Sequence, residues 1–156
     1  MTERSNQPIG TGGPDRPTVV IGDDDLSIRQ DFRRLLEHDG RFDVIGTAND
    51  GHDLVAVVTE SRPDVAVVDV RMPRATGIEA TAAIVEGTAT AVLIVTTFDL
   101  DRDVRAAIRA GASGFLLKNE AADHLADAVA AVADGQQVYN AVAIGTLVDA
   151  LTDDVL

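Results

Sequence analysis

Short runs of consecutive apolar residues constrain the fold of this chain more than any other feature of its sequence. One, covering Phe42–Ala48, is weak, and four are strong: Thr18–Ile21, Val65–Val68, Ala91–Val95 and Gly114–Leu117. A strand with one exposed face alternates apolar and polar residues, whereas a strand of a parallel sheet is covered on both faces and is apolar throughout. The runs therefore predict the strands of a buried parallel sheet.

Segments with helical spacing lie between these runs. In the first of them, residues 26–38, apolar side chains recur every three or four positions and arginines occupy the opposite face. Further helices are expected over Asp53–Ser61, Gly77–Val85, Asp101–Ala110 and Ala121–Ala133. A strand followed by a helix, repeated five times, requires right-handed crossovers. We therefore predict an α/β fold with three layers, built around a doubly wound, five-stranded parallel sheet.

The two ends of the chain differ from this repeating region. Residues 1–16 contain Gly, Pro, Ser and Asn without an apolar run, which predicts a disordered arm rather than a signal peptide or an anchor. Residues 17–135 are expected to form one globular domain, and residues 136–156 a C-terminal helical linker in which Asn140 caps a helix. No apolar stretch is long enough to span a membrane.

The composition disfavours several classes of partner and of site. A net charge of −13 at pH 7 argues against contact with nucleic acid or with an anionic membrane. The absence of cysteine excludes disulfides and thiolate metal sites, and it favours a reducing, cytoplasmic location. His38, His52 and His124 share no spacing, and we interpret them as surface residues rather than metal ligands.

Polar side chains stand where the predicted strands end. They are Asp23 and Asp24 after the first strand, Asp69 at the end of the third, Thr96 after the fourth and Lys118 after the fifth. Each alone has an ordinary structural explanation, because acidic residues cap helices, threonine favours strands and lysine is usually solvated. In open α/β sheets, however, the carboxyl ends of the strands form the ligand site. The joint occurrence at matching strand ends therefore favours one shared site.

The residue types at these strand ends point to phosphoryl transfer. Carboxylates gathered at one edge repel one another unless a cation joins them. A hard divalent ion with oxygen ligands, Mg²⁺ or Mn²⁺, suits such a group. A carboxylate beside this ion can attack phosphorus, while a lysine ammonium and a hydroxyl hold the other phosphate oxygens.

The region between Thr18 and Gly135 resembles the receiver domain of bacterial two-component response regulators, which has a flavodoxin-like fold. The segments that carry the resemblance occur in the family's order: Gly22–Arg29, Val67–Pro73 with the loop glycine Gly77, Val95–Asp99 and Ala110–Lys118. The last two resemble most the transcription factors with a C-terminal LuxR-type helix-turn-helix. Gly22 replaces the usual apolar residue before the acidic pair, and Asn119 replaces the proline that many receivers have after the lysine.

The resemblance implies a signalling domain that accepts phosphate, rather than an enzyme that turns over a separate substrate. Asp69 would be the phosphoacceptor, and a sensor histidine kinase would be the donor. Asp24 and Asp69 would bind Mg²⁺, or Mn²⁺, directly. Asp23 would help through a water molecule, and the backbone carbonyl of Arg71 would be another ligand.

The resemblance also implies a switch. Thr96 would bond one phosphate oxygen and Lys118 another, while Phe115 occupies the aromatic position that moves with Thr96. Output would be homodimerisation and control of a DNA-binding domain that this sequence does not contain. The sequence is therefore expected to be either a truncated chain or a natural stand-alone receiver, and to contact neither DNA nor a membrane itself.

Two other functions fit part of the pattern. In a haloacid-dehalogenase-like phosphatase, Asp23 would be the nucleophile, but that family needs a further strand with acidic metal ligands after the lysine, and no such strand is evident. A degenerate receiver could act only as an interaction module, but every residue of the acceptor site is present here.

Self-dephosphorylation is expected to be slow. Arg71 and Phe98 lie two residues beyond the acceptor and the switch threonine, where their bulk should obstruct the approach of water to the acyl phosphate. We predict that Phe98→Ala accelerates the decay of the phosphorylated protein, measured as loss of acyl phosphate with time. An unchanged decay rate would count against this role.

Overall fold

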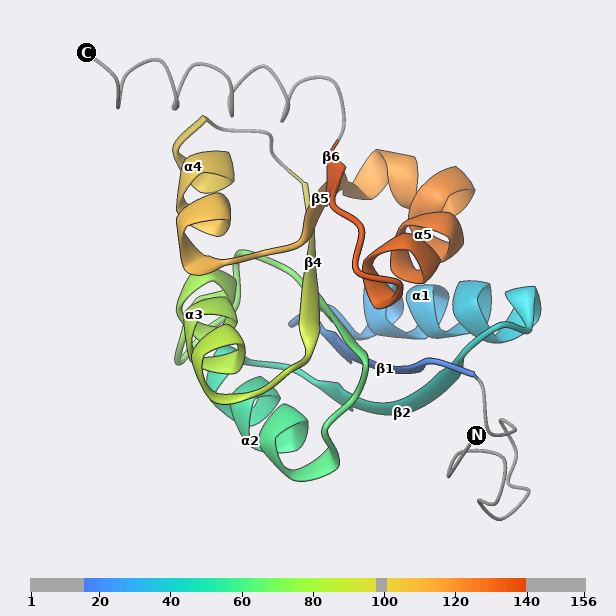
Figure 1. Cartoon of the computed structure of the whole chain (residues 1–156), viewed down its shortest axis with the longest axis horizontal. Helices are drawn as coiled ribbons and strands as arrows, with labels where there is room; N and C mark the ends of the chain where they lie inside the picture. Colours follow the sequence, from blue (N-terminus) through green and yellow to red (C-terminus); the bar gives the residue numbers. More distant parts are fainter. Residues whose placement is uncertain (1–15, 98–100, 140–156) are drawn as a thin grey trace.

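The chain folds into a parallel sheet enclosed between two layers of helices (Figure 1). The computed structural model describes residues 16–97 and 101–139. The strands in these residues are β1 (Thr18–Gly22), β2 (Asp43–Ala48), β3 (Val65–Val68), β4 (Ala91–Thr96), β5 (Gly114–Leu117) and β6 (Val138–Tyr139). The helices are α1 (Leu26–Asp39), α2 (Gly51–Ser61), α3 (Gly77–Gly87), α4 (Asp101–Ala110) and α5 (Lys118–Ala133). None of the helices within the described ranges has the length and apolar character needed to cross a membrane.

The strand order determines where a site can form. The described strands make one six-stranded sheet in the order β2-β1-β3-β4-β5-β6, and every pairing is parallel. The order changes direction at β1, because β2 lies on one side of it and β3 on the other. Doubly wound folds bind ligands beyond the carboxyl ends of the strands at such a reversal. The ends of β1 and β3 are therefore the expected location of the site.

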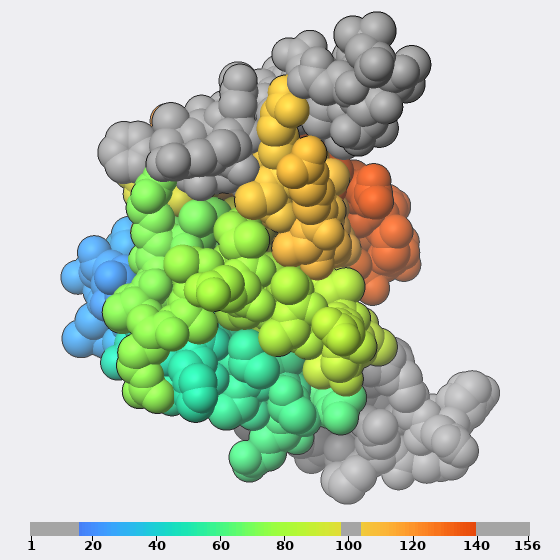
Figure 2. Space-filling view, turned by 90° about the vertical axis from the view of Figure 1, so that its left-hand side faces the viewer, coloured from blue at the N-terminus to red at the C-terminus, as the bar shows by residue number. Residues whose placement is uncertain are grey.

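Successive residues of each strand pack into opposite layers. Val20 and Ile94 belong to a core cluster with residues of α2, α3 and α4, whereas Val19 and Val95 pack with residues of α1 and α5. Figure 2 shows α2, α3 and α4 next to one another on one face of the molecule. Because helices cover both faces, β1, β3, β4 and β5 are continuous apolar runs, as the sequence predicted. The edge strand β2 is the exception, because it exposes Ile45 and Thr47.

The predicted three-layer α/β fold is confirmed, and the sheet has one strand more than the five expected. The additional strand, β6, has two residues and pairs with β5 inside the segment that we expected to be a helical linker. A strand this short leaves no periodic pattern in the sequence. All but the last residue of the predicted arm, residues 1–16, and the helix capped by Asn140 lie outside the described residues.

Capping residues start two helices earlier than the sequence pattern predicted. Helix α5 begins at Lys118, because the Glu120 carboxylate accepts the N–H of Leu117 at 2.9 Å and closes the first turn. Lys118 is therefore fixed in the first turn of a helix rather than in a loop. Helix α2 likewise begins at Gly51, because Asp50 is its N-cap.

The glycine before the acidic pair has a packing explanation. A Cβ atom on Gly22 would lie 2.8 Å from Cδ2 of Leu54 in α2, so the leucine occupies the space of an apolar side chain at this position. The apolar side chain that fills this space therefore comes from α2 instead of from residue 22.

The loop between β3 and α3 returns closely onto Asp69. The N–H of Gly77 donates to the carbonyl of Val70 at 2.8 Å. A Cβ atom on Gly77 would lie 1.9 Å from the carbonyl oxygen of Asp69, which is backbone and cannot rotate away. Gly77 therefore allows the loop to close beside the candidate acceptor.

The two glycines at the ends of α3 provide a matched test of this close approach. We predict that Gly77→Ala lowers the free energy of unfolding by about 3 kcal/mol, because the backbone of Asp69 must move. Gly87→Ala has no atom within 4 Å of the added Cβ and should instead be neutral or stabilise by up to about 1 kcal/mol. Urea unfolding measures both, and equal effects would contradict the prediction.

Candidate functional site

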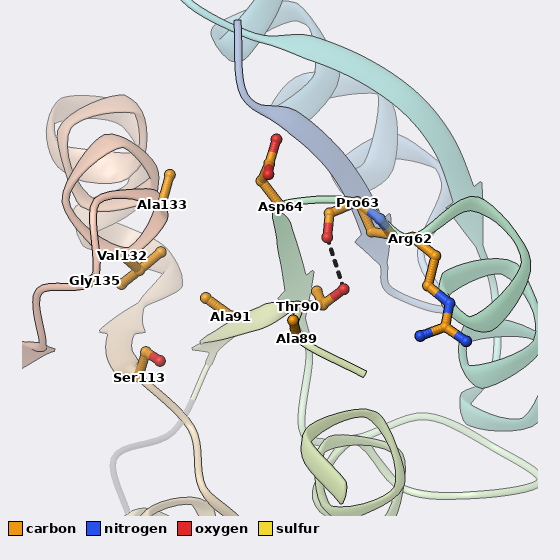
Figure 3. Close-up of a pocket in the computed structure, with 10 residues that line it drawn as sticks. All are labelled: Arg62, Pro63, Asp64, Ala89, Thr90, Ala91, Ser113, Val132, Ala133 and Gly135. Atoms are coloured by element: carbon orange, nitrogen blue, oxygen red, sulfur yellow. Dashed lines mark hydrogen bonds between the residues drawn. The ribbon is translucent and has the colours of Figure 1, made fainter. Parts of the chain in front are cut away.

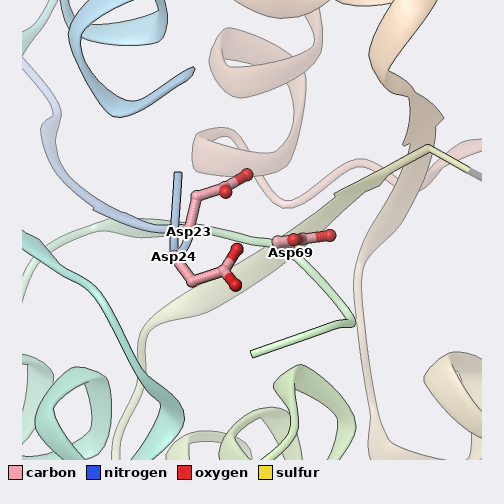
Figure 4. Close-up of side chains that lie close together, drawn as sticks. All are labelled: Asp23, Asp24 and Asp69. Atoms are coloured by element: carbon pink, nitrogen blue, oxygen red, sulfur yellow. The ribbon is translucent and has the colours of Figure 1, made fainter. Parts of the chain in front are cut away.

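Three carboxylates meet at the carboxyl ends of β1 and β3. One oxygen from each of Asp23, Asp24 and Asp69 lies within 4.8 Å of the others, and Figure 4 shows the three side chains close together. The pairing of Gly22 with Val68 causes this proximity, because the next residue of each strand emerges at the same edge. Asp23 and Asp69 are only 1% and 5% exposed, whereas Asp24 faces solvent.

Backbone hydrogen bonds hold the two buried aspartates in place. The N–H of Asp69 donates to the carbonyl of Gly22 at 2.9 Å, and the N–H of Asp23 donates to the carbonyl of Ala48 at 3.1 Å. Oδ1 of Asp23 accepts the N–H of Asp25 at 2.9 Å. Oδ2 of Asp23 has no aligned hydrogen-bond donor among the described residues. One oxygen of this buried carboxylate therefore depends on charge alone.

Lys118, the only lysine in the sequence, supplies that charge. Its Nζ lies 2.8 Å from Oδ2 of Asp23 and 3.5 Å from Oδ2 of Asp69. The shorter contact is a close ion pair. Burial acts to lower the pKa of Lys118, but the two carboxylates outweigh it and raise the pKa above its ordinary value. The ammonium therefore stays protonated at neutral pH.

The electrostatics of the site are unbalanced. Burial raises the pKa of Asp69, and the charge of Asp23 raises it further. Lys118 and the backbone N–H of Arg71 oppose this rise without cancelling it. One ammonium faces three carboxylates, so repulsion among the acidic groups remains. A set of oxygen donors with excess negative charge suits a hard divalent cation.

Thr96 ends a strand that lies between those leading to Asp69 and Lys118. Its strand, β4, lies between β3, which leads to Asp69, and β5, which leads to Lys118. Thr96 is fully buried, and its hydroxyl has no hydrogen-bond partner within the described part of the chain. A buried hydroxyl without a partner is costly, so this group is available to an incoming oxygen ligand. Phe115 of β5 is also fully buried and pairs in register with Ile94.

The sequence also singled out Arg71, Phe98 and three histidines. The side chain of Arg71 is exposed, and its backbone N–H donates to the Asp69 carboxylate. Phe98 lies outside the described residues, so its position is not tested. The histidines expected at the surface are exposed: His38, His52 and His124.

Sequence reasoning missed an ion pair that holds the loop after β3. Nη1 of Arg74 lies 3.3 Å from Oδ2 of the buried Asp50, and Arg74 has a left-handed φ of 70°. The N–H of Gly51 also donates to the carbonyl of Pro73 at 3.3 Å. The Asp50–Gly51 pair is typical of a helix start, but nothing local indicates that its partner is Arg74.

A hollow at the amino ends of the strands, away from the three carboxylates, lacks a comparable cluster of charged groups. It measures about 360 Å³ and lies near the amino ends of β4 and β5 (Figure 3). Two of its polar side chains already have protein partners. The Thr90 hydroxyl donates to the carbonyl of Pro63 at 2.7 Å, and the Asp64 carboxylate accepts the N–H of Thr18 at 2.8 Å. The carboxyl edge is therefore the candidate site.

Comparison with known sequences agrees with this geometry. A family model described as the response regulator receiver domain matches residues 19–130. The transcriptional regulatory protein YxjL of Bacillus subtilis is 38% identical over 135 residues, which cover 86% of this chain and 62% of that protein. The transcriptional regulatory protein DegU of Brevibacillus brevis is 36% identical, with 75% of this chain and 50% of that protein covered. The chain thus spans half to about three fifths of the length of these relatives.

Solved structures show the same fold. The signal receiver domain of the response regulator NarL from Mycobacterium tuberculosis superposes with a TM-score of 0.76 at 35% identity, covering 79% of this chain and 100% of that one. A LuxR-family response regulator from Aurantimonas superposes with a TM-score of 0.80 at 27% identity, covering 88% and 99% respectively.

Removal of the buried charge of Asp69 should stabilise the protein in the absence of a divalent cation. We predict that Asp69→Asn raises the free energy of unfolding at neutral pH by on the order of 1 kcal/mol, because the repulsion from Asp23 is lost. The raised pKa of Asp69 means that the wild-type protein loses stability as the pH rises from the ordinary aspartate pKa through the higher folded value. The gain should therefore vanish in acid, where Asp69 is protonated in both states.

Asp24→Asn, at the exposed member of the cluster, is the matched control and should give a smaller gain. Thermal unfolding in chelator at several pH values measures these differences. A wild-type protein more stable than Asp69→Asn at neutral pH would contradict the electrostatic account.

Proposed function

The chain belongs to the family of response regulator receiver domains, and from this premise we propose that Asp69 accepts a phosphoryl group from a sensor histidine kinase. The domain would span residues 17–135 and act in the cytoplasm. The observation that carries the proposal is the convergence of Asp69 with Asp23, Asp24 and Lys118 at one sheet edge.

The acidic cluster supports binding of Mg²⁺, or of Mn²⁺. Asp24 and Asp69 would be direct ligands, Asp23 would act through water, and the backbone carbonyl of Arg71 would complete the protein's share. The backbone of Arg71 is close enough for its N–H to reach the Asp69 carboxylate. When bound, the ion would neutralise charge on the phosphoryl oxygens. The excess of three carboxylates over one ammonium is the physical reason to expect it.

The chemistry assigned to the protein's own residues is a single displacement. A carboxylate oxygen of Asp69 bonds to phosphorus while the bond from phosphorus to the donor's leaving group breaks, and the leaving group keeps the electron pair. Lys118 exchanges part of its contact with Asp23 for a phosphate oxygen. Thr96, whose buried hydroxyl has no partner among the described residues, donates to another phosphate oxygen.

The consequence of phosphorylation would be a shift between two conformations. Movement of Thr96 toward the phosphate would be accompanied by Phe115, which lies on the neighbouring strand. We propose that the shift promotes homodimerisation and controls a DNA-binding domain in a longer protein that contains this chain. The transcriptional role of relatives such as YxjL and DegU supports this output.

The other functions considered receive less support. A phosphatase that uses Asp23 as nucleophile would leave the convergence of Asp69 with Lys118 without a role, and the family model that matches residues 19–130 is that of the receiver domain. A degenerate receiver would lack part of the acceptor site, whereas here Asp69 and Lys118 are in contact.

Phosphorylation by a small donor tests the proposal directly. With acetyl phosphate and Mg²⁺, the wild-type chain should gain one phosphoryl group that is lost at alkaline pH, detected by intact mass. Asp69→Asn should gain none, because no carboxylate remains at that position. Chelation of Mg²⁺ should prevent the reaction in the wild-type chain. Modification that persists in Asp69→Asn but disappears in Asp23→Asn would contradict the assignment of the acceptor.

A further inference from the structure

The sixth strand attaches to the same short strand that leads to Lys118. Val138 pairs with Gly114 and Tyr139 pairs with Phe115, and the N–H of Val138 donates to the carbonyl of Ser113 at 3.0 Å. Figure 1 shows β6 running along the outer side of β5. β6 is the last described element, and the sequence continues beyond it through residues 140–156.

The side chain of Tyr139 adds a second attachment. Its ring is partly buried against the core cluster that contains Phe115 and Ala107, and its hydroxyl donates to the carbonyl of Ala112 at 3.1 Å. Burial raises the pKa of this phenol above its ordinary value. Backbone and side chain of β6 therefore both hold the segment from Ala112 to Phe115.

Gly114 makes this attachment possible. A Cβ atom at Gly114 would lie 2.8 Å from the carbonyl oxygen of Val138, which is tighter than a real side chain allows. The backbone of Gly114 is not in the left-handed region, so close neighbours, and not the local conformation, exclude a side chain. Cδ1 of Leu93 would also lie 2.8 Å from the added Cβ, but the end of a leucine side chain can rotate away, whereas the backbone carbonyl of Val138 cannot. The backbones of β5 and β6 therefore approach closely at Gly114.

One strand of four residues connects this contact to the candidate acceptor site. β5 runs from Gly114 to Leu117, and the next residue, Lys118, places its Nζ against Asp23 and Asp69. Pairing with β4 on one side and with β6 on the other holds the strand along its length, so its backbone has little freedom to bend. A change in how Lys118 is held must therefore reach the β6 contact.

We propose that β6 is a strap whose docking on β5 is strengthened when a phosphoryl group occupies Asp69. The proposal rests on the proposed function, because it takes the phosphoryl group as the signal. A dianion that pairs with Lys118 orders β5, and a more ordered β5 opens its contact with β6 less often. Phosphorylation would thereby reach the chain that follows Tyr139 along the edge of the sheet.

The sequence contains two unique reporters for testing this coupling in the full chain. Tyr139 is the only tyrosine and there is no tryptophan, so intrinsic fluorescence reports β6 alone. Lys118 is the only lysine, so labelling by an amine-reactive reagent, located by peptide mapping, reports the acceptor site. The probe is beryllofluoride with Mg²⁺, compared with Mg²⁺ alone.

The expected result combines three measurements. Beryllofluoride should protect Lys118 from labelling, reduce the quenching of Tyr139 by acrylamide, and slow hydrogen exchange at the Val138 amide by about fivefold or more. The amide of Asp43, the first residue of the opposite edge strand β2, donates to the carbonyl of Pro17 at 3.0 Å. It is the internal control and should be unaffected.

The failures of the two proposals are distinguishable. Protection of Lys118 with unchanged or faster exchange at Val138 would overturn the strap and leave the proposed function standing. Absence of protection at Lys118 would overturn both.

Reciprocal coupling provides a second test with variants that leave the acceptor site intact. Since coupling free energies are symmetric, Tyr139→Ala should weaken beryllofluoride binding by about fivefold, read from protection of Lys118. Tyr139→Phe, which loses only the hydroxyl contact with Ala112, should have a smaller effect. Ile45→Ala, at an exposed position on the opposite edge strand, is the control and should bind as the wild type. Equal binding by all three variants would overturn the strap.

Discussion

Repulsion among carboxylates that are held together at one sheet edge is the constraint on which the rest of this structure depends. Two of the three are almost fully buried, and a single ammonium, that of Lys118, stands against them. Such an arrangement is unfavourable for folding alone, because buried like charges oppose one another. It is understandable as a site prepared for a divalent cation, which would bring the missing positive charge. Under the proposed function, that cation and Lys118 would then hold the phosphoryl group. Without such a cation, the repulsion among these carboxylates lowers the stability of the folded state.

The fold imposes this arrangement through backbone geometry rather than through the side chains themselves. β1 and β3 are neighbours, so Asp23 and Asp69 emerge at one edge, and β4 and β5 bring Thr96 and Lys118 to the same edge. The closely packed loop at Gly77 and the ion pair between Arg74 and Asp50 fix the chain after Asp69. Both faces of the sheet are covered by helices, which makes the strands poor candidates for independent movement. Change at the site is therefore expected to be transmitted along whole strands.

Most of this architecture could be predicted from the sequence, and the exceptions have physical causes. Continuous apolar runs predicted β1, β3, β4 and β5, because both faces of the sheet are buried there. A weaker run predicted the edge strand β2, which is partly exposed. The strand-end survey selected Asp69 and Lys118, which the structure brings into contact. The strand β6 and the contact between Arg74 and Asp50 were missed, because each depends on partners distant in the sequence and neither has a periodic pattern. The packing of Leu54 beside Gly22 could not be predicted for the same reason, because the two residues are far apart in the sequence.

The central claim is that the acidic cluster is unstable alone and is completed by a divalent cation. The most direct measurement is the thermal stability of the wild-type chain and of Asp69→Asn as a function of Mg²⁺ concentration at neutral pH. Binding to the folded state alone should raise the wild-type melting temperature progressively with Mg²⁺. The account predicts that Mg²⁺ stabilises the wild-type chain far more than the variant, so that the advantage of the variant in chelator shrinks or reverses. Equal stabilisation of the two proteins by Mg²⁺, or none of either, would contradict it.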